Sequence, residues 1–256
     1  MSGGISAYPS YPPGFWRRIA LLPEPGQITA ALEDDVHRFH LRLVHRDSVI
    51  SEVRARALRF PWTSCSQAAP FIAEELVGQR VEDVARLAAS EHCTHLLDLA
   101  ILCAAHIADR EPKRFDMQVA DRVDGRTTAR LAENGEVEMR WQLDGTRIEG
   151  PDPWAGLDLR TLSRWKNELS PADAERAALL RRALFVSGSR TTDDNAMTRA
   201  ADRGPARMGA CFTYQLPRAL GSVRIANWRR DFSLSDDEPL AGFDPDRAFA
   251  AEDDAA

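Results

Sequence analysis

Histidine, cysteine and carboxylate side chains gather in the short stretch Glu91–Asp98, where an apolar run typical of a buried helix begins. Cys93 falls at the start of that helix, where backbone N–H groups and the helix dipole favour a thiolate. His95 and Asp98 are three residues apart, so they share a helix face and can act as a base and its supporting acid. The alternative is that Cys93 is a small buried residue and that His95 and Asp98 only satisfy each other.

Asp35 and His37 form a second candidate pair for acid–base chemistry. Apolar residues alternate with polar ones over 39–43, which predicts a strand over 35–45 with one buried face. The alternation places Asp35 and His37 on that face, and a histidine beside a carboxylate is the usual arrangement of a general base. The alternative is a strand end with a solvated acid and a partly buried structural histidine.

Cys65 precedes another predicted helix, so two cysteines, Cys65 and Cys93, stand at two helix starts. They are candidates for catalysis as a reactive pair, or for a metal site together with His95, which His37 or Cys211 would complete to the four ligands that zinc prefers. Their spacing fits no zinc-finger pattern, and the alternative is that both are small buried residues. We therefore expect no cofactor, and a zinc or iron ion bound at these residues is the alternative.

Four further residues are candidates for substrate binding. Tyr214 lies in a predicted strand, where its phenol can donate to a substrate oxygen, and Arg218 can bind an anionic group. Trp62 and Arg122 are donors for a phenolate or a developing charge. Asp121 falls on the buried face of its predicted strand, which indicates either a buried ion pair or a site residue.

The composition excludes several classes of function. The basic residues are 31 arginines and two lysines, and neither lysine follows a P-loop glycine. Because no dinucleotide-binding glycine motif occurs either, nucleotide-driven chemistry and Rossmann-type cofactors are disfavoured. The formal charge of −6 belongs to residues 233–256, which hold eight acidic residues and one arginine, so the rest of the chain carries +1. We expect a small-molecule aromatic substrate as partner, no nucleic acid and no membrane, with a homo-oligomer left open.

The elements that must position these residues indicate an α+β chain. The predicted strands cover 28–32, 35–45 and 49–60, and the predicted helices cover 68–77 and 94–108. Asp-Gly or Asn-Gly pairs recur every ten residues from Asp124 and predict a four-stranded antiparallel meander over 114–149. We therefore expect an N-terminal three-stranded sheet with two cysteine-led helices, then the meander and C-terminal helices.

No flexible linker separates these blocks, so residues 15–232 are expected to form a single composite α+β domain. Residues 1–14 are expected to be an extended N-terminal segment and residues 233–256 an acidic disordered tail. The sequence starts without a secretory signal pattern and contains no apolar run long enough to span a membrane. We therefore expect a cytoplasmic protein with its four cysteines reduced.

Five motifs lie between Trp16 and Arg230: Leu32-Glu33-Asp34-Asp35-x-His37-x-Phe39, Pro61-Trp62-Thr63-x-Cys65, Cys93-Thr94-His95-Leu96-x-Asp98-Leu99, Asp121-Arg122-Val123-Asp124-Gly125-Arg126-Thr127 and Met208-Gly209-x-Cys211. Together they resemble a bacterial family described as domain of unknown function 2889. The resemblance implies catabolism of lignin-derived diaryl compounds by a cofactor-independent carbon–carbon lyase that releases a hydroxymethyl carbon as formaldehyde. Such a step needs a base, for which His37 with Asp35, or His95 with Asp98, are the candidates.

A second resemblance covers residues 28–108. Three strands, a cysteine loop and a second cysteine that opens a helix are similar to the iron–sulfur scaffold (NifU-like) fold. In that fold, cysteines at positions like Cys65 and Cys93 bind metal, but the aspartate that follows the first cysteine by two residues is here Gln67. The alternative function is therefore a metal-binding or scaffold-like protein that uses Cys65, Cys93 and Cys211.

Overall fold

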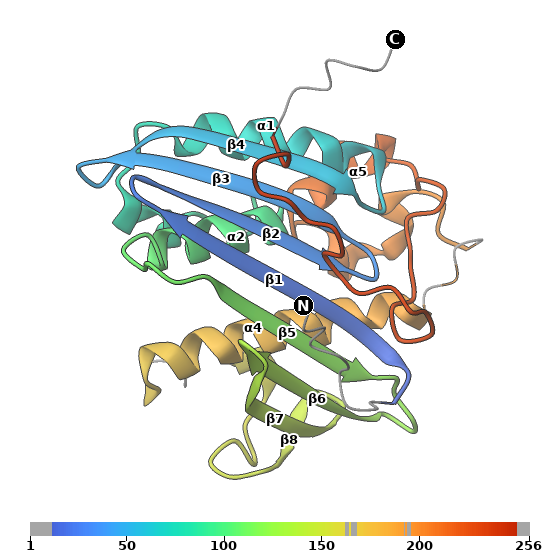
Figure 1. Cartoon of the computed structure of the whole chain (residues 1–256). Coiled ribbons are helices and arrows are strands. Elements are labelled where there is room, and N and C mark those ends of the chain that lie inside the picture. The colour runs from blue at the N-terminus through green and yellow to red at the C-terminus, as the bar shows by residue number, and fades with distance from the viewer. Residues whose placement is uncertain (1–11, 162–163, 165–167, 192, 194–195, 250–256) are drawn as a thin grey trace. The chain divides into compact units, whose positions relative to one another are not determined.

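The structure is a computed structural model that describes residues 12–161, 164, 168–191, 193 and 196–249. Its strands form one eight-stranded antiparallel sheet in the order β4-β3-β2-β1-β5-β6-β7-β8 (Figure 1). The strands are β1 (Gly14–Glu24), β2 (Gln27–Asp34), β3 (Arg38–Arg46), β4 (Val49–Arg59), β5 (Lys113–Ala120), β6 (Arg126–Glu133), β7 (Glu136–Asp144) and β8 (Arg147–Gly150). The predicted fold class, a three-stranded sheet followed by a four-stranded meander, is therefore wrong.

The error arises at β1, a strand that the sequence analysis missed. β1 is hydrogen-bonded to both β2 and β5, so it makes one sheet of what the sequence analysis predicted as two. Its buried residues alternate from Phe15 to Leu21, but they include the charged Arg17. A charge at a buried position hides the apolar alternation from which strands are predicted.

The described residues divide into two compact units, and β1 contributes to both. The first unit comprises Met1–Arg17, Phe115–Thr191 and Asp231–Asp237, and the second comprises Arg18–Arg114, Thr192–Arg230 and Glu238–Ala256. Residues 1–11 and 250–256, which belong to the segments predicted to be extended and disordered, lie outside the described residues.

In the first unit, β5 to β8 follow one another as antiparallel neighbours. Their turns lie at the predicted Asp-Gly and Asn-Gly pairs, where Asp124 and Asn134 adopt positive φ angles of 49° and 51°. Asp121 is exposed rather than buried, because β5 ends at Ala120 and the alternation stops there. Its carboxylate pairs with Arg190 at 2.6 and 3.0 Å.

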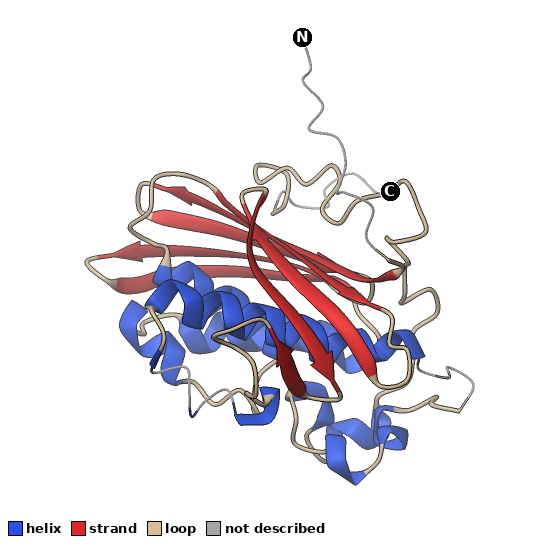
Figure 2. Cartoon of the chain, turned by 90° about the horizontal axis from the view of Figure 1, so that it is seen from below, coloured by secondary structure: helices blue, strands red, loops and turns tan. Residues whose placement is uncertain are grey.

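The helices are α1 (Ala68–Leu76), α2 (Thr94–Ala105), α4 (Pro171–Ser187) and α5 (Arg218–Gly221), joined by short 3-10 turns that include η1 (Thr63–Gln67), η2 (Val81–Arg86) and η8 (Phe212–Tyr214). In the first unit α4 contacts β6. In the second unit α1 contacts β4, and α2 contacts β2 and β3, so helices cover one face of these strands (Figure 2). Among the described residues every helix is too short or too polar to cross a membrane.

Tyr214 does not lie in a strand, as was predicted, but in the turn η8. Gly209 adopts a φ angle of 75°, and its N–H donates to the carbonyl of Tyr214 at 3.0 Å. This bond folds the segment back on itself, because a positive φ at glycine reverses the chain where a strand would continue.

The register of β2, β3 and β4 separates an apolar face from a polar face. Leu32 lies opposite Phe39 on the face that the helices cover. On the other face Glu33 lies opposite Arg38, and His40 lies opposite Arg56. This second set, which also contains Thr29, Arg42 and Arg54, is called the polar face below.

Residues 238–249, called the C-terminal segment below, run along the polar face (Figure 1). Arg42 donates to the carbonyl of Pro245 at 2.8 Å, and Arg56 donates to that of Ala248 at 3.1 Å. The ring of His40 lies 4.8 Å from that of Phe243. Contacts with the sheet therefore hold a segment whose composition alone is too polar to form a core.

The burial of His40 beneath this segment is expected to make the protein less stable in acid. Burial, together with the charges of Arg38 and Arg56, lowers the pKa of His40 from 6.5 to about 4, although the nearby backbone of Ala248 opposes this shift. As the pH falls from 6.5 through 4, the unfolded chain binds the proton first, so the free energy of unfolding decreases by about 2–3 kcal/mol. Urea unfolding at neutral pH and near pH 4 measures this decrease.

The variant His40→Gln is the control, because glutamine is polar but does not titrate in this range. Its free energy of unfolding should decrease less over the same pH interval, by the amount assigned to His40. An equal decrease in both proteins would show that other groups cause the acid sensitivity.

Candidate functional site

The turn between β2 and β3 holds a carboxylate and a histidine together. β2 ends at Asp34, whose Oδ1 accepts hydrogen bonds from the backbone N–H groups of Val36 at 2.8 Å and His37 at 2.7 Å. An aspartate before a turn commonly bonds backbone groups two or three residues later in this way. The same oxygen lies 3.2 Å from Nδ1 of His37, so the turn also orients the imidazole.

The hydrogen-bonded partner of His37 is therefore Asp34, whereas the sequence analysis paired it with Asp35. That pairing extended the alternation of β3 backwards, but β3 begins only at Arg38, and alternation does not hold within a turn. Asp35 is buried, and its carbonyl accepts hydrogen bonds from Arg59 and from the backbone of Arg230. The sequence signal for Asp34 is an aspartate placed directly before a predicted turn.

α2 brings His95 to the same place from the other side. The ring of His95 lies 3.8 Å from that of His37, with 30° between the planes, and Phe39 stacks on both rings. Asp34, His37 and His95 are 0%, 9% and 8% exposed, and one donor atom of each lies within 4.8 Å of the others. These three residues are called the histidine cluster below.

The histidine cluster can move a proton. Two imidazolium charges at the stacking distance would repel strongly in a buried place, so protonation of both rings at once is disfavoured and a neutral ring can act as a base. An ionised Asp34 accepts a hydrogen bond from Nδ1 of His37, and in that tautomer Nε2 is the nitrogen that takes up a proton. The side chain of His37 keeps 11% of its surface accessible.

The same cluster is also the set of residues that would hold a metal ion. Two histidines and one carboxylate, with other positions open, are ligands for a divalent metal such as iron or zinc. The donor atoms of these three side chains lie close enough together to form a group that could hold a metal ion. Among the described residues, no other group of histidine, cysteine and acidic side chains meets the same distance criterion. The predicted metal site at Cys65, Cys93 and His95 does not appear as such a group.

The cysteines Cys65, Cys93 and Cys211 are neighbours nonetheless, since Cys211 acts electrostatically on both buried thiols and Cys65 acts on Cys93. Burial raises the pKa of Cys65 to about 12, and Cys211 adds to this effect. Burial also raises the pKa of Cys93, with contributions from Cys65 and Cys211. The structure describes all four cysteines of the chain, and no disulfide joins any of them. A buried neutral thiol is a poor nucleophile, so this arrangement gives no support to a reactive cysteine pair.

Trp62 and Tyr214, two of the predicted substrate-binding residues, lie together. Nε1 of Trp62 donates to the hydroxyl of Tyr214 at 3.2 Å. Trp62 and Cys65 belong to one buried apolar cluster, against which Tyr214 packs. Burial raises the pKa of Tyr214, so its phenol stays protonated at neutral pH and can donate.

Two other predicted residues are already engaged elsewhere. Arg218 donates to the carbonyl of Phe212, and its guanidinium lies 3.5 Å from the centre of that ring. Arg122 belongs to the first unit, where it donates to the carbonyl of Gly125 at 2.8 Å. The role of Asp98, half-buried on α2, stays a prediction.

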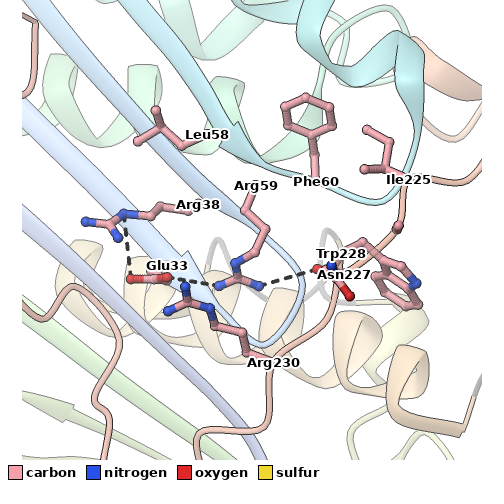
Figure 3. A pocket seen from close by; sticks show the side chains of 10 residues that line it. Glu33, Arg38, Leu58, Arg59, Phe60, Ile225, Asn227, Trp228 and Arg230 are labelled. Atoms are coloured by element: carbon pink, nitrogen blue, oxygen red, sulfur yellow. Dashed lines mark hydrogen bonds and ion pairs between the residues drawn. The ribbon is translucent and has the colours of Figure 1, made fainter. Parts of the chain in front are cut away.

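Arg59, at the end of β4, is a positioning residue that the sequence analysis missed. Its guanidinium donates to the carboxylate of Glu33 at 3.0 Å and to the carbonyls of Asp34 at 2.6 Å and Asp35 at 2.7 Å (Figure 3 shows its bond to Glu33). Arg59 thereby holds the turn that carries Asp34 and His37. An arginine at a strand end is too common to have indicated this role in advance.

Comparisons with known proteins assign part of the chain to a family. A search of curated proteins gives no match. A family model described as "Protein of unknown function (DUF2889)" matches residues 23–109, a span that contains the histidine cluster, Trp62, Cys65 and Cys93. The resemblance to the NifU-like scaffold is not shown by these comparisons. Residues 23–109 are therefore similar to the DUF2889 family of proteins of unknown function.

Proposed function

We propose that the protein is a carbon–carbon lyase that works by acid–base chemistry at the histidine cluster and needs no cofactor. The proposed substrate is a lignin-derived diaryl compound with a hydroxymethyl side chain, and one product is formaldehyde. The observation that carries the proposal is the stacking of His37 on His95 at 3.8 Å, with Asp34 bonded to His37. In this proposal a neutral imidazole, whose Nδ1 donates to Asp34, acts as the base in the part of the chain that matches the family model.

The proposed reaction begins when the imidazole removes the proton of the hydroxymethyl O–H group. The oxygen lone pair forms the C=O bond of formaldehyde as the carbon–carbon bond breaks. The electron pair of that bond moves to the neighbouring carbon and is delocalised into the aromatic ring. The imidazolium then returns the proton to this carbon, so that hydrogen replaces the lost hydroxymethyl group.

The developing charge on the aromatic ring needs a hydrogen-bond donor. Tyr214 suits this role, because its oxygen accepts from Trp62 and its own O–H group can donate. Arg218 and Arg122 are weaker candidates, because both already donate to backbone carbonyls.

A product analysis in heavy water tests this function. The purified protein is incubated with a diaryl compound that carries the hydroxymethyl group, with and without a chelator. We expect one formaldehyde per molecule of shortened product, one deuteron on the carbon that lost the group, and no effect of the chelator. Turnover without formaldehyde, or a product without deuterium at that carbon, would contradict the mechanism.

A metal-dependent function is the second candidate, favoured by the donor atoms that lie within 4.8 Å of one another. This candidate uses Asp34, His37 and His95, whose donor atoms lie close together, where the sequence-based alternative used Cys65, Cys93 and Cys211. Elemental analysis of the purified protein distinguishes the two proposals. Stoichiometric zinc or iron that is lost in His95→Ala, together with loss of activity in chelator, would favour the metal-dependent function.

We also propose a cytoplasmic location, which the four cysteines support because none of them forms a disulfide.

A further inference from the structure

A cavity of about 380 Å³ opens on the polar face, beside residues 225–230 (Figure 3). Its volume lies in the range of small-molecule binding sites, which is about 300–1,000 Å³. All of its lining residues belong to the second unit. The two imidazoles of the histidine cluster are not among the residues that line it.

The charged residues that line the cavity favour an anion. Three arginines, Arg38, Arg59 and Arg230, stand against one carboxylate, that of Glu33. Glu33 is only 2% exposed and is already paired with Arg59 at 3.0 Å. Its other oxygen accepts a hydrogen bond from the backbone of Leu240 at 2.8 Å.

Arg38 is left incompletely satisfied by these contacts. Its Nε lies 3.7 Å from Glu33, an ion-pair distance that is too long for a hydrogen bond. Among the described residues this buried nitrogen has no hydrogen-bond partner. Arg230 is exposed and lines the same cavity. The pocket therefore has the guanidinium groups of Arg38 and Arg230 available for a ligand, in addition to that of Arg59, which neutralises Glu33.

The rest of the wall is apolar, formed by Leu58, Phe60, Ile225 and Trp228. Figure 3 shows Phe60, Ile225 and Trp228 on the side of the pocket away from Arg38 and Glu33. An inorganic anion would use the arginines but leave this wall in contact with water. A guanidinium fork matches a planar carboxylate, and apolar side chains match a ring.

We propose that this pocket binds a small aromatic carboxylate, with its carboxylate on Arg38 and Arg230 and its ring against Phe60 and Trp228. The site is distinct from the histidine cluster and does not depend on the proposed lyase function. Arg59 connects the two, because it lines the pocket and also bonds the carbonyls of Asp34 and Asp35.

Calorimetric titration of the full chain with benzoate tests the proposal. Benzamide has the same shape without the charge, and acetate has the charge without the ring. We expect benzoate to bind about tenfold more tightly than benzamide, since one charge-assisted hydrogen bond corresponds to about that factor. We also expect benzoate to bind more tightly than acetate, because acetate has no ring to bury against Phe60 and Trp228. The substitutions Arg38→Gln and Arg230→Gln should each weaken benzoate binding about tenfold.

Arg54→Gln is the matched control, because Arg54 is an exposed arginine of β4 that does not line the pocket. This variant should bind benzoate with the same affinity as the unchanged protein. Benzoate should also shift the indole N–H resonance that disappears in Trp228→Phe. Equal binding of benzoate and benzamide, unchanged binding in both pocket variants, or phosphate binding as tight as benzoate would overturn the proposal. None of these measurements involves turnover, so they stand apart from the lyase test.

Discussion

Replacing His37 with alanine is expected to lower kcat for formaldehyde release by about 10²–10⁴-fold, the usual contribution of a general base. His37 is the histidine whose tautomer is held by a carboxylate, through the 3.2 Å contact of Nδ1 with Asp34. The substrate gains little ground-state binding from this proton transfer, so KM should change much less than kcat. Steady-state kinetics with formaldehyde detection measures both parameters.

Two further variants separate catalysis from structure. Asp34→Asn keeps the size of the side chain but not its charge, so the protein should fold while kcat falls and its pH profile shifts. His45→Ala removes a histidine of β3, the strand that follows His37, outside the cluster, and should leave kcat unchanged. Full activity in both His37→Ala and His95→Ala would remove the histidine cluster from the mechanism.

Replacing Arg59 with glutamine is expected to lower the free energy of unfolding by about 3–5 kcal/mol, the usual cost of removing one partner of a buried ion pair. Arg59 is 12% exposed at its side chain, and Glu33 would keep only Arg38 as a charged partner, at 3.7 Å. The carbonyls of Asp34 and Asp35 would also lose their guanidinium donor. Urea unfolding followed by circular dichroism measures the change.

The comparison variants for Arg59 lie on the same strand. Arg54→Gln removes an exposed arginine, whose ion pair with Glu52 is worth about 0–1 kcal/mol at most. Arg59→Lys keeps the charge but cannot reach three oxygens with one planar group, so it should fall between the two. A decrease in Arg59→Gln no larger than in Arg54→Gln would show that Arg59 does not hold the turn.

Turns could be predicted from the sequence more accurately than the pairing of distant strands. Asp-Gly and Asn-Gly pairs act over two residues, so the turns at Asp124 and Asn134 could be located without knowing the rest of the fold. Whether two groups of strands share a sheet depends on the strand between them. That strand, β1, was hidden because Arg17 occupies one of its buried positions.

The candidate site shows the same limit. His37 and His95 were each identified as a possible base from their neighbours in sequence, but their stacking depends on how α2 packs on β2 and β3. The contact of Asp34 with His37 was not foreseen, because alternation was carried into a turn where Asp34 bonds the backbone. The contacts of Arg59 follow from the register of β4, which no local pattern specifies.

The polar face of the sheet can be covered only late in the synthesis of the protein, because the C-terminal segment that covers it is made last. It bonds strands that lie 203 and 207 residues earlier in the chain, through Arg42 with Pro245 and Glu33 with Leu240. During synthesis, β2 and β3 are therefore complete long before the residues that cover them exist. Contacts over such separations form slowly, because a long loop must close first. The arginines and His40 of the first-made strands thus stay open to solvent, and to chaperones, until residues 238–249 have left the ribosome.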